Sequence, residues 1–177
     1  FLRRIVDDGS VAAVFCKMLP YDGTPIKETL MAQGRFNGDV CNPDYDFLDP
    51  RIARCYEAIG RTVGEWVRGS DCVAAMINHA WHEVFVMERL FEPAADLVAY
   101  KTALSAVTKF SNNILFSVVE EICDGFREGG GECQQYSGLG QIREQILATL
   151  VQQRNRFVYE NQSWLLKGIS KQTLVTA

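Results

Sequence analysis

Apolar residues recur at intervals of three and four along most of the chain. Alternation of apolar and polar residues persists nowhere long enough to predict a strand. The pattern therefore predicts an all-α protein of six to eight helices, with no internal repeat at the periods of solenoid proteins. A length of 177 residues with 47% hydrophobic content is typical of one domain with a sizeable core. We expect a single globular helical domain over residues 1–177.

Three helices are expected in the first part of the chain. The first covers about 1–19 and ends at Pro20, because proline cannot continue a helix. Gly9-Ser10 is a position where this helix could be broken. A short helix over 25–34 follows a Thr-Pro start signal. The clearest start is Asp49-Pro50, where aspartate can cap the first turn of a helix that ends near residue 69.

The segment 71–92 is predicted to be the central helix of the bundle. Its apolar residues cover well over half of the helix circumference, which is typical of a helix buried on several sides. We expect its core residues to include Ile77, Trp81, Val84 and Phe85. The charged residues and histidines within it make a membrane span very costly, so we expect no transmembrane segment.

The last part of the chain contains further helical patterns. Residues 94–110 and 111–126 form either two helices, the second capped by Ser111, or one bent helix. The glycine-rich stretch 125–140 is predicted to be a flexible hinge. Residues 139–167 are predicted to form a long amphipathic helix.

The stretch 34–49, GRFNGDVCNPDYDFLD, is the clearest loop, and it is unusually aromatic. Phe36, Tyr45 and Phe47 have no helical face to bury them here. Because aromatic side chains near a surface are common anchors of protein interfaces, we predict that these three carry the contact with a partner. The alternative is that they fold back and plug the bundle.

The strongest candidate for a chemical site is the histidine pair of the chain, His79 and His82, followed by Glu83. Their spacing allows convergence on one metal ion, but no third histidine exists and the order matches no known zinc signature. We therefore expect no metal site and interpret the histidines as a solvent-facing stripe of the helix. No other pattern indicates a catalytic group or a cofactor, so we expect a non-enzymatic protein.

Net charge and its distribution along the chain indicate which classes of partner are favoured. A formal charge of −4 argues against nucleic-acid binding. Residues 70–138 carry four Lys or Arg against ten Asp or Glu, whereas residues 139–177 carry five against two. This asymmetry favours oriented docking to a protein partner or self-association.

The cysteines indicate a reducing compartment. Four of the six lie in helical patterns, where a reduced cysteine is a small buried hydrophobe, and no C-x-x-C pair occurs. We therefore expect an intracellular protein with free thiols. Since the sequence begins with Phe1, we also expect residues upstream of it.

Two short stretches resemble known families. Residues 66–91 resemble the middle of a nuclear-receptor ligand-binding domain, although Asp71-Cys72 stands where that family has Asp-Gln. Residues 30–34 and 60–63 are similar to the homology motifs of the apoptosis-regulating helical bundles, with Arg35 in place of an aspartate. Each match covers a small part of the chain, so we assign it to no family.

These observations favour a helical protein–protein interaction domain with an adaptor, regulatory or self-assembling role. The alternative is a domain that binds a small apolar ligand in a cavity between helices.

Overall fold

The computed structural model describes residues 2–129 and 136–175. Over these residues the chain forms seven helices and no strand, which confirms the predicted all-α fold. The helices are α1 (Leu2–Ile5), α2 (Pro25–Ala32), α3 (Pro50–Val67), α4 (Val73–Leu90), α5 (Ala95–Arg127), α6 (Leu139–Glu160) and α7 (Gln162–Val175).

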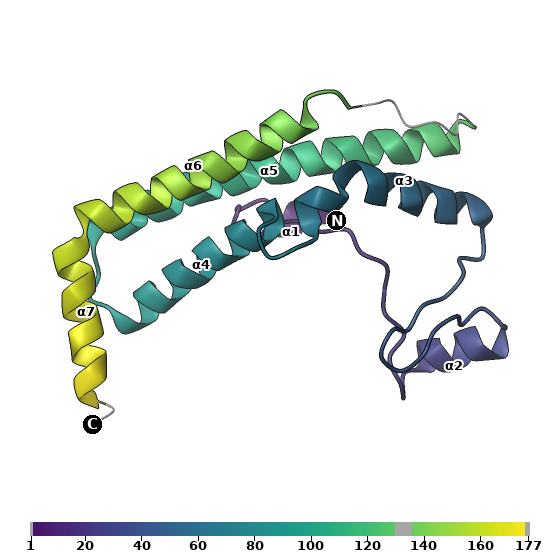
Figure 1. Cartoon of the computed structure of the whole chain (residues 1–177), viewed down its shortest axis with the longest axis horizontal. Helices are drawn as coiled ribbons and strands as arrows, with labels where there is room; N and C mark the ends of the chain where they lie inside the picture. Colours follow the sequence, from purple (N-terminus) through teal and green to yellow (C-terminus); the bar gives the residue numbers. More distant parts are fainter. Residues whose placement is uncertain (1, 130–135, 176–177) are drawn as a thin grey trace.

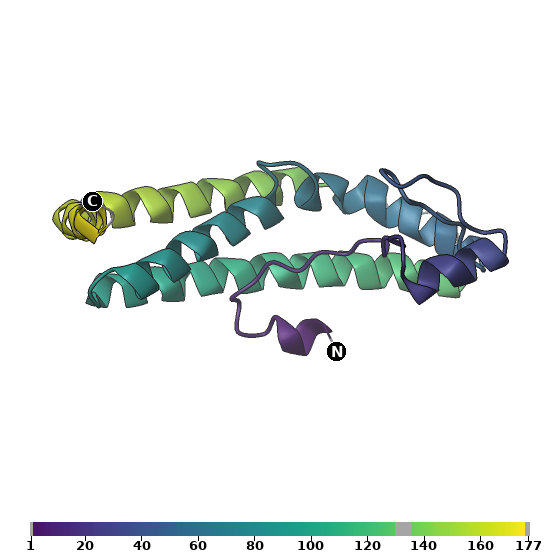
Figure 2. The ribbon, with the colours of Figure 1, turned by 90° about the horizontal axis from the view of Figure 1, so that it is seen from below.

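The helices are arranged as an arch (Figure 1). α5 and α6 run antiparallel along its back, and α3 and α4 follow one another beneath them. α7 turns away at one end of the arch, and α2 lies at the other end. The view from below in Figure 2 shows α4 lying alongside both α5 and α6. The aromatic loop and the C-terminal helix are therefore at opposite ends of the molecule.

The hydrophobic core lies where α4, α5 and α6 pack together and continues between α3 and α5. The residues of α4 that face it have the expected spacing of three and four: Val73, Ala74, Ile77, Ala80, Val84 and Met87. α4 packs against three helices, and so does α5. The central position of the segment 71–92 thus stays a prediction.

Phe85 was expected in this core, and that expectation is wrong. Its side chain is 58% exposed. It follows Val84 and therefore points about 100° further round the helix, beyond the face that α5 and α6 cover. Trp81, also expected in the core, is only partly buried, and its indole N–H donates to the Thr108 hydroxyl at 3.2 Å. The apolar surface of α4 is thus wider than its contact with the bundle.

The segment 95–127 is one helix of 33 residues, which decides between the two alternatives. Ser111 does not cap a second helix, because it is buried in the middle of α5 and accepts a hydrogen bond from the Trp66 indole at 3.0 Å. Of the predicted hinge over 125–140, residues 125–127 belong to α5 and residues 139–140 to α6. Residues 130–135 of that hinge lie outside the described residues.

The predicted helix over 139–167 is divided in two. α6 ends at Glu160, and Asn161 separates it from α7. Asn161 is buried, and its side-chain amide donates to the Phe157 carbonyl oxygen at 3.0 Å. By hydrogen-bonding the last turn of α6, this side chain competes with continuation of the helix, as asparagine often does.

The largest difference between prediction and structure concerns the first 20 residues. The expected helix over 1–19 ends at Ile5, the chain turns at Gly9 with φ of +71°, and residues 12–21 are irregular and extended. Figure 2 shows this segment running along α5 before it reaches α2. Side chains of the helix bundle hydrogen-bond the N–H groups of Ala12 and Ala13 and the carbonyl oxygen of Val11, so these three peptide groups have partners without a helix.

Two local expectations in the first part are confirmed. Asp49 caps α3, and its carboxylate accepts a hydrogen bond from the main-chain N–H of Arg51 at 2.8 Å. α2 begins at Pro25, as the Thr-Pro signal predicts. The stretch 34–49 between these helices contains no helix, as expected.

Candidate functional site

The loop over 34–49 is a small closed hairpin. Phe36 and Tyr45 form an isolated antiparallel bridge, and main-chain hydrogen bonds of 2.8 Å lie on both sides of it. The turn at 38–42 is closed by the Asp39 carboxylate, which accepts two amide hydrogen bonds of 2.8 Å. The loop is irregular, but its own hydrogen bonds hold it in one shape.

The three aromatic residues predicted as partner contacts lie over two lysines. The ammonium group of Lys27 is 4.5 Å from the centre of the Phe36 ring. The ammonium group of Lys17 is 4.4 Å from the Tyr45 ring and 4.9 Å from the Phe47 ring. Such cation–π contacts stabilise a partly exposed site by about 0.5–1 kcal/mol. The structure thus brings Tyr45 and Phe47 together and places Phe36 in a separate contact.

Tyr45 and Phe47 also attach the loop to α3. Their ring centres are 5.5 Å apart, and the Phe47 ring is 5.8 Å from the ring of Tyr56 in α3. The loop is therefore folded back onto α3, which resembles the alternative in which the aromatic residues plug the bundle. Both rings are only partly buried, so each also presents part of its surface to a partner.

Lys17 joins the extended segment to the loop. Its ammonium group contacts the Asp44 carboxylate at 2.5 Å and the Tyr45 carbonyl oxygen. Its main-chain N–H donates to the Tyr56 hydroxyl at 3.1 Å. The hydrogen bond from Lys17 lowers the pKa of the Asp44 carboxyl, and the amide of Tyr45 lowers it further. The ammonium group of Lys17 is therefore held by the Asp44 carboxylate and by two aromatic rings.

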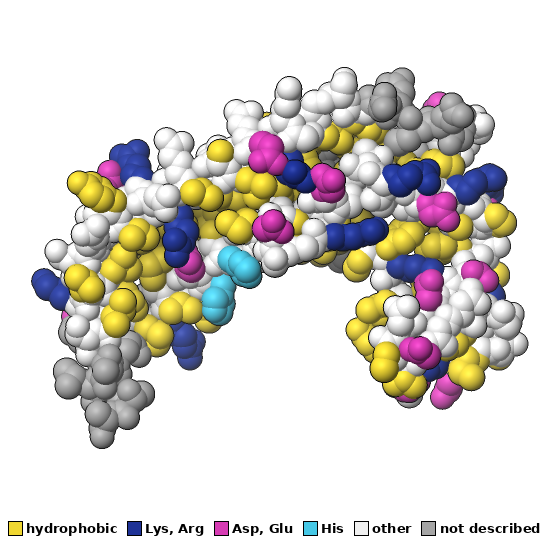
Figure 3. Space-filling view, in the orientation of Figure 1, with side chains coloured by type: hydrophobic (Ala, Val, Ile, Leu, Met, Phe, Trp, Pro, Cys, Tyr) yellow, Lys and Arg dark blue, Asp and Glu magenta, His cyan; other side chains and the backbone are white. Residues whose placement is uncertain are grey.

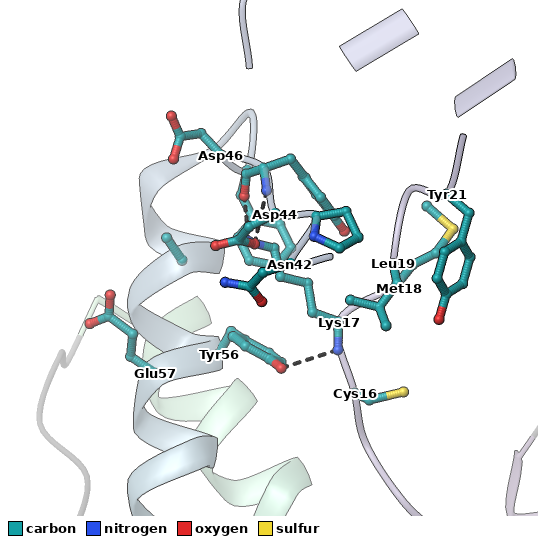
Figure 4. Close-up of a pocket in the computed structure, with 14 residues that line it drawn as sticks. Cys16, Lys17, Met18, Leu19, Tyr21, Asn42, Asp44, Asp46, Tyr56 and Glu57 are labelled. Carbon is teal, nitrogen blue, oxygen red and sulfur yellow. Dashed lines mark hydrogen bonds and ion pairs between the residues drawn. The ribbon is translucent and has the colours of Figure 1, made fainter. Parts of the chain in front are cut away.

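An open cleft of about 920 Å³ lies beside this pair. We call it the loop cleft and define it by residues 16–21 of the extended segment, 42–47 of the loop and 53–57 of α3. Figure 4 shows Met18, Leu19 and Tyr21 on one side of it and Tyr56 and Glu57 of α3 on the other. The walls of the cleft thus come from three segments that lie apart in the sequence.

Large apolar side chains are exposed around the loop cleft. Met18 is 52% exposed, Leu19 49% and Tyr21 59%. Figure 3 shows hydrophobic side chains at the surface of the same end of the molecule. Apolar side chains gathered in one exposed place are typical of an interaction surface.

Sequence reasoning missed one wall of this cleft. Met18, Leu19 and Tyr21 were assigned to the end of a helix or to the turn after it. The sequence contains no signal for this wall, because residues 11–19 are apolar at every position but Lys17 and fit a helical spacing. Tyr56 was assigned to an apolar helix face, and its role in holding the loop depends on a fold that the local pattern does not contain.

The histidine cluster lies away from the loop cleft. His79 and His82 are exposed on α4, and Figure 3 shows both at the hollow underside of the arch. Glu83 is bound by the Arg154 guanidinium of α6 through hydrogen bonds of 2.7–3.0 Å. Within residues 2–129 and 136–175, no three His, Cys, Asp or Glu side chains gather in a group that could hold a metal ion.

A groove of about 280 Å³ separates α4 from α6 beside Glu83 and Arg154. Its apolar walls come from Met76 and Ala80 of α4 and Leu150 and Val151 of α6. If the chain binds a small apolar ligand, as the alternative hypothesis holds, we expect it here. The groove is at the lower end of the sizes usual for ligand sites.

No family model, no curated protein and no solved structure matches the chain. In the described part of the chain, no helix combines the length and apolarity needed to cross a bilayer. Among the described cysteines there is no disulfide, and the Sγ atoms of Cys55 and Cys123 lie 3.7 Å apart.

Proposed function

We propose that the chain is a non-enzymatic interaction domain that binds another protein through the loop cleft. The observation that carries this proposal is the group of exposed apolar side chains that line the cleft, with Tyr21 59% and Met18 52% exposed. Burying them against a partner would contribute on the order of 25 cal/mol per Å² of apolar surface. The partly buried Tyr45 and Phe47 rings would lie at the centre of such a contact, where aromatic hot spots are usual.

The charge around the cleft favours a basic partner. Its lining contains the carboxylates of Asp44, Asp46 and Glu57 against the single ammonium of Lys17, which already contacts Asp44. Complementary charge raises the association rate and excludes acidic partners. We therefore infer that the occupant is a protein segment with apolar side chains next to lysine or arginine.

We propose an intracellular setting, because four of the six cysteines lie in helical patterns of the sequence and no C-x-x-C pair occurs. We propose a regulatory or adaptor role in which the helices hold the cleft and the partner supplies any chemistry. Self-association is the alternative arrangement, in which a second copy supplies the partner segment.

The proposal is tested by selecting ligands from a random peptide library displayed against the purified chain. We expect selected peptides to combine aliphatic or aromatic residues with lysine or arginine. Replacing Tyr21, which lines the cleft, with serine should weaken the best peptide by about 2 kcal/mol, or roughly thirtyfold in Kd. Because Tyr21 is 59% exposed, the loss of its ring should leave the melting temperature nearly unchanged.

Leu166→Ser is the matched control, since Leu166 is 65% exposed on α7 at the other end of the arch. It should leave Kd unaltered. Equal effects of the two serine variants, or selection of acidic peptides, would reject the loop cleft as the binding surface. Light scattering of the free chain distinguishes self-association from binding to another protein, because self-association would give a mass of at least a dimer.

A further inference from the structure

The extended N-terminal segment is held through its main chain. The side-chain amide of Asn112 in α5 donates to the Val11 carbonyl oxygen at 3.0 Å and accepts from the Ala13 N–H at 2.8 Å. The Ser105 hydroxyl donates to the Asp8 carbonyl oxygen at 2.6 Å. One carboxamide thus pairs with a donor and an acceptor of an extended peptide, as a neighbouring strand would.

Two further contacts continue this pattern along the bundle. Asn78 of α4 accepts from the Ala12 N–H at 3.4 Å, and the Tyr56 hydroxyl of α3 accepts from the Lys17 N–H. Residues 8–17, which we call the strap, therefore lie in a groove whose walls come from α3, α4 and α5. The polar groups of this groove contact peptide groups, which every sequence possesses.

The groove restricts the side chain of the strap at only a few positions. Ala12 and Ala13 are 7% and 9% exposed, so the groove is closed to larger residues there. Phe15 packs edge-on against Phe116 of α5, with ring centres 5.4 Å apart at 88°. Val14, between them, is 49% exposed. The groove thus fits two small residues followed, two positions later, by an aromatic ring.

Asn112 adds a hydrogen-bonding requirement to the packing of the strap in the groove. It is 4% exposed, and its side-chain amide is used for the strap. Only a peptide that offers both a main-chain donor and a main-chain acceptor can cover this carboxamide without leaving it buried and unpaired, which would cost about 1–3 kcal/mol. Main-chain pairing combined with pockets for selected side chains is a general mode of peptide recognition.

We propose that this groove is a second binding site, which takes an extended peptide of the type small-small-x-aromatic, and that the strap occupies it as an intramolecular ligand. A tethered ligand has an effective concentration of about millimolar, so a free peptide competes only when the strap is weakened. The strap contains a turn at Gly9 and is followed by the irregular residues 18–24, so none of its own residues belongs to a helix of the bundle. Its last residues, Cys16 and Lys17, also line the loop cleft, but the proposal does not rest on the function of that cleft.

The test uses the full chain with the strap released. Ala12→Glu and Ala13→Glu together place two charges at positions that admit only small buried side chains. The probe is a synthetic peptide of residues 8–19, with Cys16→Ser and a fluorophore, measured by fluorescence anisotropy. We expect it to bind the released chain at least about tenfold more tightly than the unmodified chain, because the tethered competitor is removed.

Two controls establish where the peptide binds. Adding Asn112→Leu to the released chain should abolish binding, whereas adding Tyr21→Ser should leave it unchanged. A probe with Phe15→Ser should bind at least about tenfold more weakly, since it loses the ring contact with Phe116. The wild-type peptide should also raise the melting temperature of the released chain by mass action.

A released chain that is folded but does not bind the peptide would overturn the proposal. So would a released chain that stays unfolded in excess peptide, because the groove would then not exist apart from the strap. Dimers of the unmodified chain that exchange their straps would also contradict it, since a second copy rather than a separate partner would be the occupant.

Discussion

The indole N–H of Trp66 in α3 donates a hydrogen bond of 3.0 Å to the hydroxyl of Ser111 in α5, and both residues are buried, at 4% and 2% exposure. Trp81 and Thr108 repeat this arrangement between α4 and α5 at 3.2 Å. α5 therefore presents hydroxyl groups to both indoles from inside the core. These bonds favour the observed packing of α5 against α3 and α4, because an unpaired buried N–H is unfavourable.

Replacing Ser111 with alanine should destabilise the protein by about 1–3 kcal/mol, because the Trp66 indole N–H loses its buried acceptor. Ser117→Ala is the matched control, since Ser117 is an exposed residue of the same helix. Thermal unfolding should show a melting temperature lowered by several degrees for Ser111→Ala alone. Equal melting temperatures for the two variants would show that this hydrogen bond does not contribute.

The regular helices were predictable because their signals are local. The Asp49-Pro50 cap, the Thr24-Pro25 start and the spacing of Val73, Ile77 and Val84 each lie within a few residues of the element they define. The exposure of Phe85 was not predictable, since it depends on how much of α4 its neighbours cover. Periodicity identifies a helix, but the width of its buried face is a property of the packing.

The strap and the loop cleft could not be predicted from local sequence patterns, because both depend on contacts between distant parts of the chain. Residues 12–17 are extended because Asn78 and Asn112, more than 60 residues away in the chain, supply the hydrogen bonds that a helix would otherwise make. Tyr45 and Phe47 were correctly identified as unusual in a loop. Their contact with Lys17 links the loop to a segment that had been assigned to a helix.

The anchoring of the loop should depend on pH through Asp44. Lys17 lowers the pKa of this carboxyl in the folded protein. A lowered folded pKa means that the stabilising contact is complete above the unfolded pKa, near 3.9, and is lost as pH falls through the folded value. Amide NMR shifts of Lys17 and Tyr45 should therefore change together below about pH 4 and not between pH 5 and 8.

Asp44→Asn should abolish the shared acid titration of these two amides. Asp49 provides an internal reference, since Arg51 lowers its pKa at the start of α3 and its titration should persist in the variant. If the Lys17 and Tyr45 amides still titrate together in Asp44→Asn, another group controls the loop.

The histidine cluster should bind no zinc ion specifically. Glu83 is engaged by Arg154 of α6, which leaves two exposed histidines on one helix, and structural zinc sites require four ligands. Protein purified without an affinity tag should contain well below one equivalent of zinc by elemental analysis. One equivalent that disappears when His79 and His82 are replaced by alanine would contradict this prediction.

The docking of α7 should depend on Gly168. Glycine in a helix interior is less favourable than alanine by about 1 kcal/mol, so Gly→Ala usually stabilises a helix. At Gly168, however, a Cβ atom would lie 2.4 Å from the ring of Phe91, which itself packs against Trp164 with ring centres 5.1 Å apart. Because the Phe91 ring cannot yield without disturbing Trp164, α7 has to move, and we expect Gly168→Ala to lower the melting temperature.

Gly64→Ala is the matched comparison for this effect. Gly64 also lies inside a helix, α3, but an added Cβ would meet only the Arg68 side chain, at 3.9 Å or more. This variant should therefore gain about 0.5–1 kcal/mol from helix propensity and raise the melting temperature by a few degrees. Opposite signs for the two glycine variants would establish that α7 packs against Phe91 in solution, whereas an equal gain from both would show that it does not.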